Sequence, residues 1–443
     1  MTDAPRLYVV HCIDTEGPLT EDVAATFERL ESIFGLKLEA SADTLARLQR
    51  GEIDLGGREE QVARVVSPRL LQYNNGWSDV RAMLDEALSP AFRDRMVDDF
   101  GRGWTYSWHC MDHAGYSDNP RRKDLGYGNV FRYYRQMLAA TGSRHDELNW
   151  HFHPLSFGRN PLQCATSYVN SYDVLMQVLC RRIVEEGWFP AANRPGFHSE
   201  RPDSHAFLEQ WIPFDYANQY YDGVDDGQPD LTRGRFGDWR RASPSWRGYR
   251  PAHDDYQAEG SCRRWIFRCL NVGTRFNELQ ARHVEQAYEE AARHGSAILA
   301  FADHDYRDLR PDVQYVRELL QAVRGKFPQV KLAFAGAVEA ARAHTAAMNP
   351  AAGHDELDLS LEVHNGVVEV RVRQGTVFGP QPFLALKTVG GRYHHDNLDV
   401  HLPGRAWTYT LDEQTLRPNE VETVAVAAAG RDGSTCVRRV AVR

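Results

Sequence analysis

The first 345 or so residues alternate short apolar runs with longer amphipathic ones. Residues 7–13 (LYVVHCI) are almost all apolar and end abruptly in polar residues, as a strand buried on both faces does where it leaves a sheet. We predict further strands over residues 104–111, 148–152, 298–301 and 330–334. Apolar residues at three-to-four spacing predict helices over residues 169–186, 277–294 and 312–326. This rhythm is typical of an α/β domain.

The pattern changes after residue 346. A linker-like stretch (MNPAAGHDELD) is followed by segments in which apolar and polar residues alternate with a period of two. Asn365-Gly366 and Asp432-Gly433 are turn signals between such segments. We therefore predict two domains: an α/β domain over residues 1–350, and a small sandwich-like all-β domain over residues 351–443, with the boundary near residue 352.

Composition narrows the class of protein. The 443 residues are 42 % hydrophobic, which is enough to build real cores and excludes global disorder. The 52 Lys and Arg against 61 Asp and Glu give a net charge of −9, so no general attraction to nucleic acid or anionic membranes is expected. No run approaches the roughly 18 to 20 apolar residues of a membrane span, and the N-terminus does not resemble a secretion signal. We expect a soluble cytoplasmic protein without membrane insertion.

The seven cysteines favour the same compartment. They are odd in number, widely spread and free of CxxC pairs, so neither a disulfide framework nor a thiolate zinc site is indicated. Reduced thiols are the simpler reading. The sequence also lacks the phosphate-binding loop, the dinucleotide-binding glycine motif, the serine-hydrolase elbow and the HExxH helix, which removes support for those four chemistries.

Two motifs combine metal-ligand residue types at extended spacing. Asp14 and Glu16 stand two apart at the end of a predicted strand, so one carboxylate could bind a metal while the other accepts a proton. His151 and His153 share one strand face in the same way, and their imidazoles suit a divalent ion. The alternatives are a polar turn after the strand for the first pair and hydrogen-bonded core histidines for the second.

Two further motifs carry candidate catalytic groups. His304 lies between Asp303 and Asp305, where a neighbouring Asp could fix its imidazole and make it a general acid; the alternative is a capped helix N-terminus. Arg194 opens a Pro-Gly loop that also holds His198. Its guanidinium could clamp a carboxylate, either that of a substrate or that of Asp14, and the alternative is a surface loop.

Four motifs resemble those of the polysaccharide deacetylase superfamily, carbohydrate esterase family 4 type. In order along the chain they are IDTEGP, WHFHP, RPGFHSE followed by FDYAN, and FADHD. The likeness is greatest to its divergent branch with DxE and HxHP motifs and covers about residues 6–345. The resemblance implies an irregular (β/α) barrel with the site at the carboxyl ends of the strands, and one divalent metal ion, usually zinc.

Carried over by resemblance, Asp14 would be the general base, and Glu16, His151 and His153 the metal ligands. Arg194 would orient the base and His304 would be the acid. Most members have adjacent aspartates and histidines four apart, so which of Asp14 and Glu16 ligates stays open. His109 and His113 have that four-residue spacing and are second-choice ligands or substrate contacts.

A long segment from residue 220 to 269 interleaves aromatic residues with Arg and Asp. Aromatic rings among polar side chains are typical of a sugar-binding wall, and the candidates here are Trp246 and Tyr249, with Trp239 and Tyr256. His198 is a further candidate substrate contact. The alternative is a well-packed loop.

The function expected is metal-dependent removal of an N-acetyl or other acyl group from a sugar, glycan precursor or small amide. The alternative functions are a catalytically silent carbohydrate-binding protein and a metal-dependent hydrolase of another bond. A homo-oligomer is compatible with each of these functions.

Overall fold

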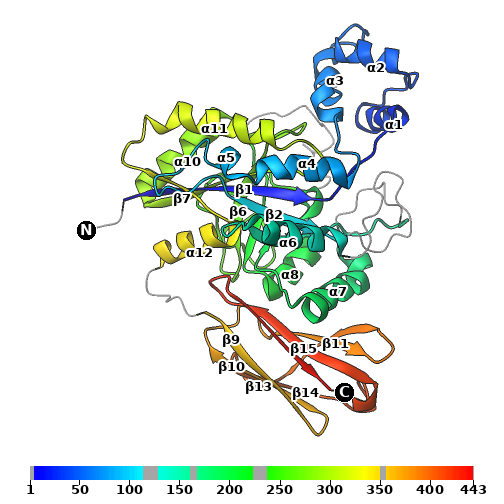
Figure 1. The fold of residues 1–443 in the computed structure, drawn as a ribbon, viewed down its shortest axis with the longest axis vertical. Coiled ribbons are helices and arrows are strands. Elements are labelled where there is room, and N and C mark those ends of the chain that lie inside the picture. Colours follow the sequence, from blue (N-terminus) through cyan, green and yellow to red (C-terminus); the bar gives the residue numbers. More distant parts are fainter. Residues whose placement is uncertain (1–3, 113–127, 160–166, 223–236, 350–355, 443) are drawn as a thin grey trace.

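The computed structural model describes residues 4–112, 128–159, 167–222, 237–349 and 356–442. Seven parallel strands form its centre, and their pairings, including that of the first with both the second and the seventh, close a barrel (Figure 1). In chain order these strands are β1 (Arg6–Thr15), β2 (Tyr106–Met111), β3 (Glu147–His151), β4 (Ala192–Asn193), β5 (Phe214–Asn218), β6 (Trp265–Asn271) and β7 (Ser296–His304). An eighth strand, β8 (Lys331–Phe334), pairs with the first half of β1. The prediction of an α/β barrel is therefore confirmed.

Helices surround the barrel strands. They are α4 (Trp77–Ala87), α5 (Pro90–Arg93), α6 (Asn129–Thr141), α7 (Tyr172–Arg181), α8 (Pro202–Trp211), α10 (Ala281–His294), α11 (Arg310–Arg324) and α12 (Ala337–Met348). The helix predicted over 277–294 begins four residues later, because Asn277 has a φ of +51° that no α-helix accommodates. The helix predicted over 169–186 is a 3₁₀ turn, α7 and a final π-helical turn in succession.

The alternation of side chains along β1 aims Asp14 into the barrel. Tyr8, Val10 and Cys12 share an apolar cluster with residues of β5, β6 and β7, whereas Leu7 and Val9 pack with the outer helices. Successive side chains of a strand point to opposite faces. Asp14 therefore continues the inward row at the carboxyl end of the strand.

A small helical unit leaves the barrel directly after β1. It consists of α1 (Val23–Phe34), α2 (Ala42–Gln49) and α3 (Glu59–Val65), and it has its own apolar core around Leu30 and Val62. Figure 1 shows it beyond the tip of β1. The chain returns through residues 67–76, where the Asn74 backbone N–H donates to the Tyr306 carbonyl. The unit therefore stands over the carboxyl ends of the strands.

The C-terminal part is a sandwich of two four-stranded antiparallel sheets, as the period-two pattern predicts. One sheet contains β9 (Asp358–His364), β10 (Val367–Gln374), β13 (Asp399–Leu402) and β14 (Ala406–Thr410). The other contains β11 (Phe383–Thr388), β12 (Tyr393–Asp396), β15 (Val421–Ala429) and β16 (Thr435–Ala441). Asn365 and Gly366 both have positive φ, as a tight hairpin turn between β9 and β10 requires.

The sandwich packs firmly on the barrel domain. Phe383 and Ala425 belong to the same buried cluster as Phe189 and Trp211, and the ring centres of Trp211 and Phe383 are 5.2 Å apart. The predicted domain boundary near residue 352 lies outside the described residues. No helix in the described ranges is long and apolar enough to cross a membrane.

Candidate metal and active site

The strand registers bring the predicted residues to one end of the barrel. Asp14 is paired in register with His304 of β7 on one side and with His109 of β2 on the other. His151 is the last residue of β3, which lies beyond β2. Parallel strands end at the same rim of a barrel. Three of the four motifs, which are far apart in the sequence, thus meet at the carboxyl ends of the strands.

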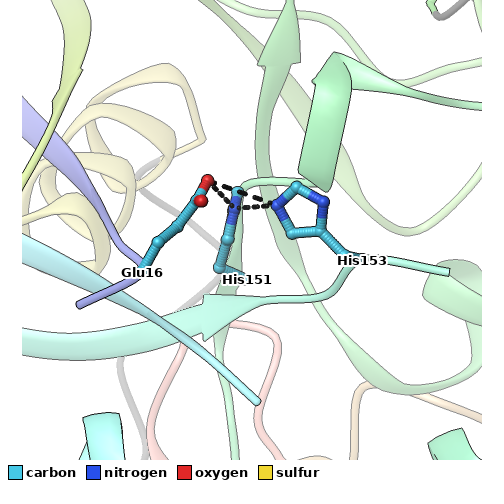
Figure 2. A group of neighbouring side chains, drawn as sticks. All are labelled: Glu16, His151 and His153. Atoms are coloured by element: carbon cyan, nitrogen blue, oxygen red, sulfur yellow. Dashed lines mark hydrogen bonds and ion pairs between the residues drawn. The ribbon is translucent and has the colours of Figure 1, made fainter. Parts of the chain in front are cut away.

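Glu16, His151 and His153 converge on a common point (Figure 2). One ligand atom from each lies within 4.8 Å of the other two. Glu16 Oε1 is 3.5 Å from His151 Nε2 and 3.4 Å from His153 Nε2, and the two Nε2 atoms are 2.8 Å apart. One carboxylate and two imidazoles suit zinc and leave room for water or substrate as a further ligand. The group could hold a metal ion.

Electrostatics at His151 support this fit. Burial lowers the pKa of His151, but the carboxylates of Asp14 and Glu16 outweigh burial and leave the pKa above its ordinary value. The two carboxylates therefore favour positive charge at this point, and a bound divalent cation would be stabilised by the same negative potential. His151 Nδ1 donates to the Arg194 carbonyl at 2.7 Å, which turns Nε2 toward Glu16. A hydrogen bond at the second ring nitrogen is how proteins orient ligating histidines.

Asp14 lies beside this group and is held by Arg194. The Arg194 Nε atom is 3.0 Å from Asp14 Oδ1, and both residues are almost completely buried. Burial raises the pKa of Asp14, although the charge of Arg194 opposes the rise. A carboxylate with a raised pKa is a better proton acceptor. Of the two partners predicted for the Arg194 clamp, the structure shows the protein's own Asp14, and Arg194 is not on a surface loop.

His198 supports the guanidinium from its other side. Its Nδ1 atom is 2.9 Å from Arg194 Nη1 and accepts a hydrogen bond from it. Burial, reinforced by the charge of Arg194, holds the pKa of His198 well below its usual range, so the ring is neutral and free to accept. His198 itself has a positive φ of 51°. The structure gives this residue a contact with the Arg194 clamp, and its predicted contact with substrate stays a proposal.

His304 faces Asp14 across the site. Its Nε2 atom is 3.6 Å from Asp14 Oδ2 and 3.9 Å from Glu16 Oε1. Burial holds the pKa of His304 well below its usual range. The expectation that a neighbouring Asp fixes this imidazole is wrong. Asp303 pairs with His11 at 3.0 Å, and Asp305 binds backbone N–H groups of residues 16 and 17.

Two of the predicted substrate contacts lie away from the site. Trp246 and Tyr249 are 1 % and 3 % exposed and lie near the amino-terminal ends of β7 and β6, where they contact the backbone of Ile298 and Ile266. The predicted sugar-binding wall is therefore wrong at these two residues, because a buried ring offers no face to a sugar. His109 is fully buried beneath the site, and burial holds its pKa well below the usual range. His113 lies outside the described residues.

Asp305 has a role that the sequence does not predict. Its buried carboxylate accepts the backbone N–H groups of Glu16 and Gly17, and also the Tyr134 hydroxyl at 2.8 Å. This fixes the backbone that carries a candidate ligand. The only local signal is its position directly after His304, which is equally typical of a helix cap.

In comparisons with known proteins, no family model matches this sequence, and no curated protein matches it at a significant level. The function of the chain is therefore inferred from the geometry of the site.

Proposed function

We propose that the chain is a metal-dependent hydrolase of the polysaccharide deacetylase type that removes an N-acetyl or other acyl group from a sugar, a glycan precursor or a related small amide. One observation carries this proposal: a buried carboxylate held by an arginine, Asp14, adjoins a separate carboxylate and two imidazoles that converge within 4.8 Å. A proton acceptor beside a metal-ligand group is the arrangement that metal-assisted hydrolysis needs.

Glu16, His151 and His153 would hold the ion, and zinc suits this donor set. Once bound, such an ion polarises a carbonyl oxygen and makes water more acidic. Of the two carboxylates left open as ligands, Glu16 belongs to the converging group, whereas Asp14 is engaged by Arg194. The structure thus supports different roles for the two acids.

The proposed proton path uses Asp14 and His304. Asp14 takes a proton from the attacking water, helped by its raised pKa, while Arg194 keeps its carboxylate in place. His304 is neutral in the described state because its pKa is lowered, so it must gain a proton before it can donate one. Asp14 Oδ2 lies 3.6 Å from His304 Nε2, so the proton that Asp14 accepts has a short route to His304 and from there to the departing amine.

The test is an assay of acetate release. N-acetylated amino sugars of increasing length would be incubated with the zinc-loaded full chain, and both acetate and the free amine would be measured. The proposal predicts acetate and amine in equal amounts with the sugar chain intact. A shortened glycan without acetate would favour hydrolysis of another bond, and no product from any acylated substrate would favour the silent binding protein.

A further inference from the structure

Among the described residues, the guanidinium groups of Arg275 and Arg307 have no carboxylate partner. Arg307 is 7 % exposed and Arg275 is half-buried. Arg307 Nε donates to the Leu70 carbonyl at 3.1 Å, and Arg275 Nε donates to the Val65 carbonyl at 3.0 Å. Within the described ranges, no carboxylate oxygen lies within 4.0 Å of either guanidinium. Enclosed charges in proteins are normally paired, so these two stand out.

Both side chains meet at residues 70 and 73, on the segment that returns from the helical unit. Arg275 Nη2 lies 3.5 Å from both the Leu70 carbonyl oxygen and the Tyr73 hydroxyl. The Arg307 guanidinium lies 5.3 Å from the centre of the Tyr73 ring. Burial and the Glu21 carboxylate raise the pKa of Tyr73, but the positive charges of Arg275, Arg29 and Arg307 outweigh both and lower that pKa. The net field at this point is therefore positive, in a chain whose net charge is −9.

A third arginine nearby shows the contrast. Arg29 of α1 is bound through both terminal nitrogens by the Glu21 carboxylate. Its charge is therefore offset within the protein. Nothing in the described residues offsets Arg275 and Arg307 in this way, and the site keeps an excess of positive charge.

The arginine pair adjoins the candidate active site at two places. Arg307 follows Tyr306, whose ring lies 4.7 Å from that of His304 and 6.1 Å from that of Tyr73. Arg275 precedes Phe276, whose ring lies 5.9 Å from that of His198. Each arginine is thus one residue away from a side chain that contacts the site. A substrate held at the metal-ligand group could reach toward them.

Arg275 also lines a cavity of about 250 Å³ that opens between the helical unit and the barrel. Arg64, Arg69 and Ser67 line its wall on the side of the helical unit, and Thr274 lines it on the barrel side. Arg69 is paired with Asp312, and Glu278 is the acidic residue among those that line the cavity. The lining is therefore mostly polar and carries more positive than negative charge. Such a lining suits a compact oxyanion and not an apolar group.

We infer that Arg275 and Arg307 form an oxyanion-binding site that holds a phosphate or carboxylate group of the substrate beside the candidate metal site. The guanidinium fork matches both oxyanions, and charge-assisted hydrogen bonds make such contacts strong. The identity of the anion as part of a substrate rests on the proposed function; the binding of an anion does not. The substrate class is then an acylated sugar or small amide that carries a negative charge.

The test is calorimetric titration of the full chain with inorganic phosphate and with acetate, at low and constant ionic strength. We expect saturable binding of at least one of the two by the wild type, and the stronger ligand identifies the anion. Arg275→Gln should weaken this binding about tenfold or more, because it removes the charge and the fork. Arg293→Gln is the matched control, since Arg293 is 64 % exposed on α10 and remote from the cavity; it should bind as the wild type does.

Two further variants keep the outcomes distinct. Arg275→Lys keeps the charge and should retain part of the binding, which separates loss of an anion contact from a folding defect. The double variant His151→Ala/His153→Ala removes the metal-ligand imidazoles and should bind the anion as the wild type does. The inference is overturned if neither anion binds, if Arg275→Gln binds as well as the wild type, or if binding is lost only in the double variant. The metal content of the double variant tests the proposed function separately, so the two failures can be told apart.

Discussion

The Asp305 carboxylate accepts a hydrogen bond of 2.8 Å from the backbone N–H of Glu16, a residue 289 positions earlier in the chain. A second N–H, that of Gly17, binds both carboxylate oxygens. The loop after β7 thereby fixes the loop after β1, from which the Glu16 side chain reaches His151 and His153. Asp305 is a positioning residue for the metal-ligand group.

Asp305→Ala should weaken zinc binding about 10- to 100-fold, the usual effect of removing a group that orients a ligand. Zinc affinity would be measured by competition with a chelator of known strength. Tyr134→Phe is the matched control, because it removes a hydrogen bond from Asp305 but leaves the contacts to residues 16 and 17 intact. Equal zinc affinity in wild type and Asp305→Ala would show that Glu16 needs no such support.

Asp14→Asn should leave zinc bound and reduce turnover about 10²- to 10⁴-fold, since the amide cannot accept the proton. Single-turnover acetate release and elemental analysis on the same sample provide both readouts. Loss of zinc in this variant would instead place Asp14 among the ligands.

Arg194→Gln should move the acidic limb of the pH–rate profile to higher pH. Arg194 opposes the rise in the pKa of Asp14, so its removal lets that pKa rise further, and Asp14 loses its proton only at higher pH. The profile of kcat/KM against pH would show the shift. Arg194→Lys keeps the positive charge and should shift the limb less. An unmoved limb in Arg194→Gln would mean that Asp14 does not control it.

Glu147, a buried residue outside the candidate site, should make the free energy of unfolding depend on pH. Its carboxylate accepts the backbone N–H groups of Val338 and Glu339 at the start of α12, and burial raises its pKa from 4.5 to about 7. The folded state therefore binds this proton more tightly than the unfolded state does. The contribution of Glu147 is most favourable below pH 4.5 and is lost as the pH rises to about 7.

Glu147→Gln mimics the protonated acid, so its free energy of unfolding should fall less than that of the wild type across this pH window. Urea unfolding at several pH values measures the difference. Glu362→Gln, at an exposed residue of β9, should keep the wild-type dependence. Parallel curves for wild type and Glu147→Gln would contradict the raised pKa.

The sequence predicts four of the seven barrel strands, β1, β2, β3 and β7, and the site residues at their ends for one physical reason. A buried parallel strand is a continuous apolar run, and polar residues at its carboxyl end have few roles other than chemistry or capping. This holds for Asp14 at the end of β1, for Glu16 directly after it and for His304 at the end of β7. It is why the pair Asp14 and Glu16, with His151 and His153, could be predicted as metal-ligand candidates, whereas the choice of Glu16 over Asp14 rests on the family resemblance.

Contacts between distant segments could not be predicted in the same way. Trp246 among arginines resembles an exposed sugar-binding ring, but the Arg268 guanidinium covers it at 4.6 Å inside the protein. Asp303 was expected to serve His304, yet its partner His11 lies on another strand and faces away from the site. In both cases the neighbouring residues in the sequence do not reveal the contact that forms. Only the packing of remote elements decides whether the Trp246 ring is exposed and which side chain Asp303 contacts.

The proposed function requires that Glu16, His151 and His153 hold one divalent ion. Elemental analysis of the full chain after zinc loading and removal of excess metal tests it most directly, with His151→Ala/His153→Ala as the variant. His364→Ala/His401→Ala removes two exposed histidines of the sandwich and is the control. The structure predicts about one zinc per chain in the wild type and the control, and none in the variant. Equal zinc in all three, or none in the wild type, would contradict the claim.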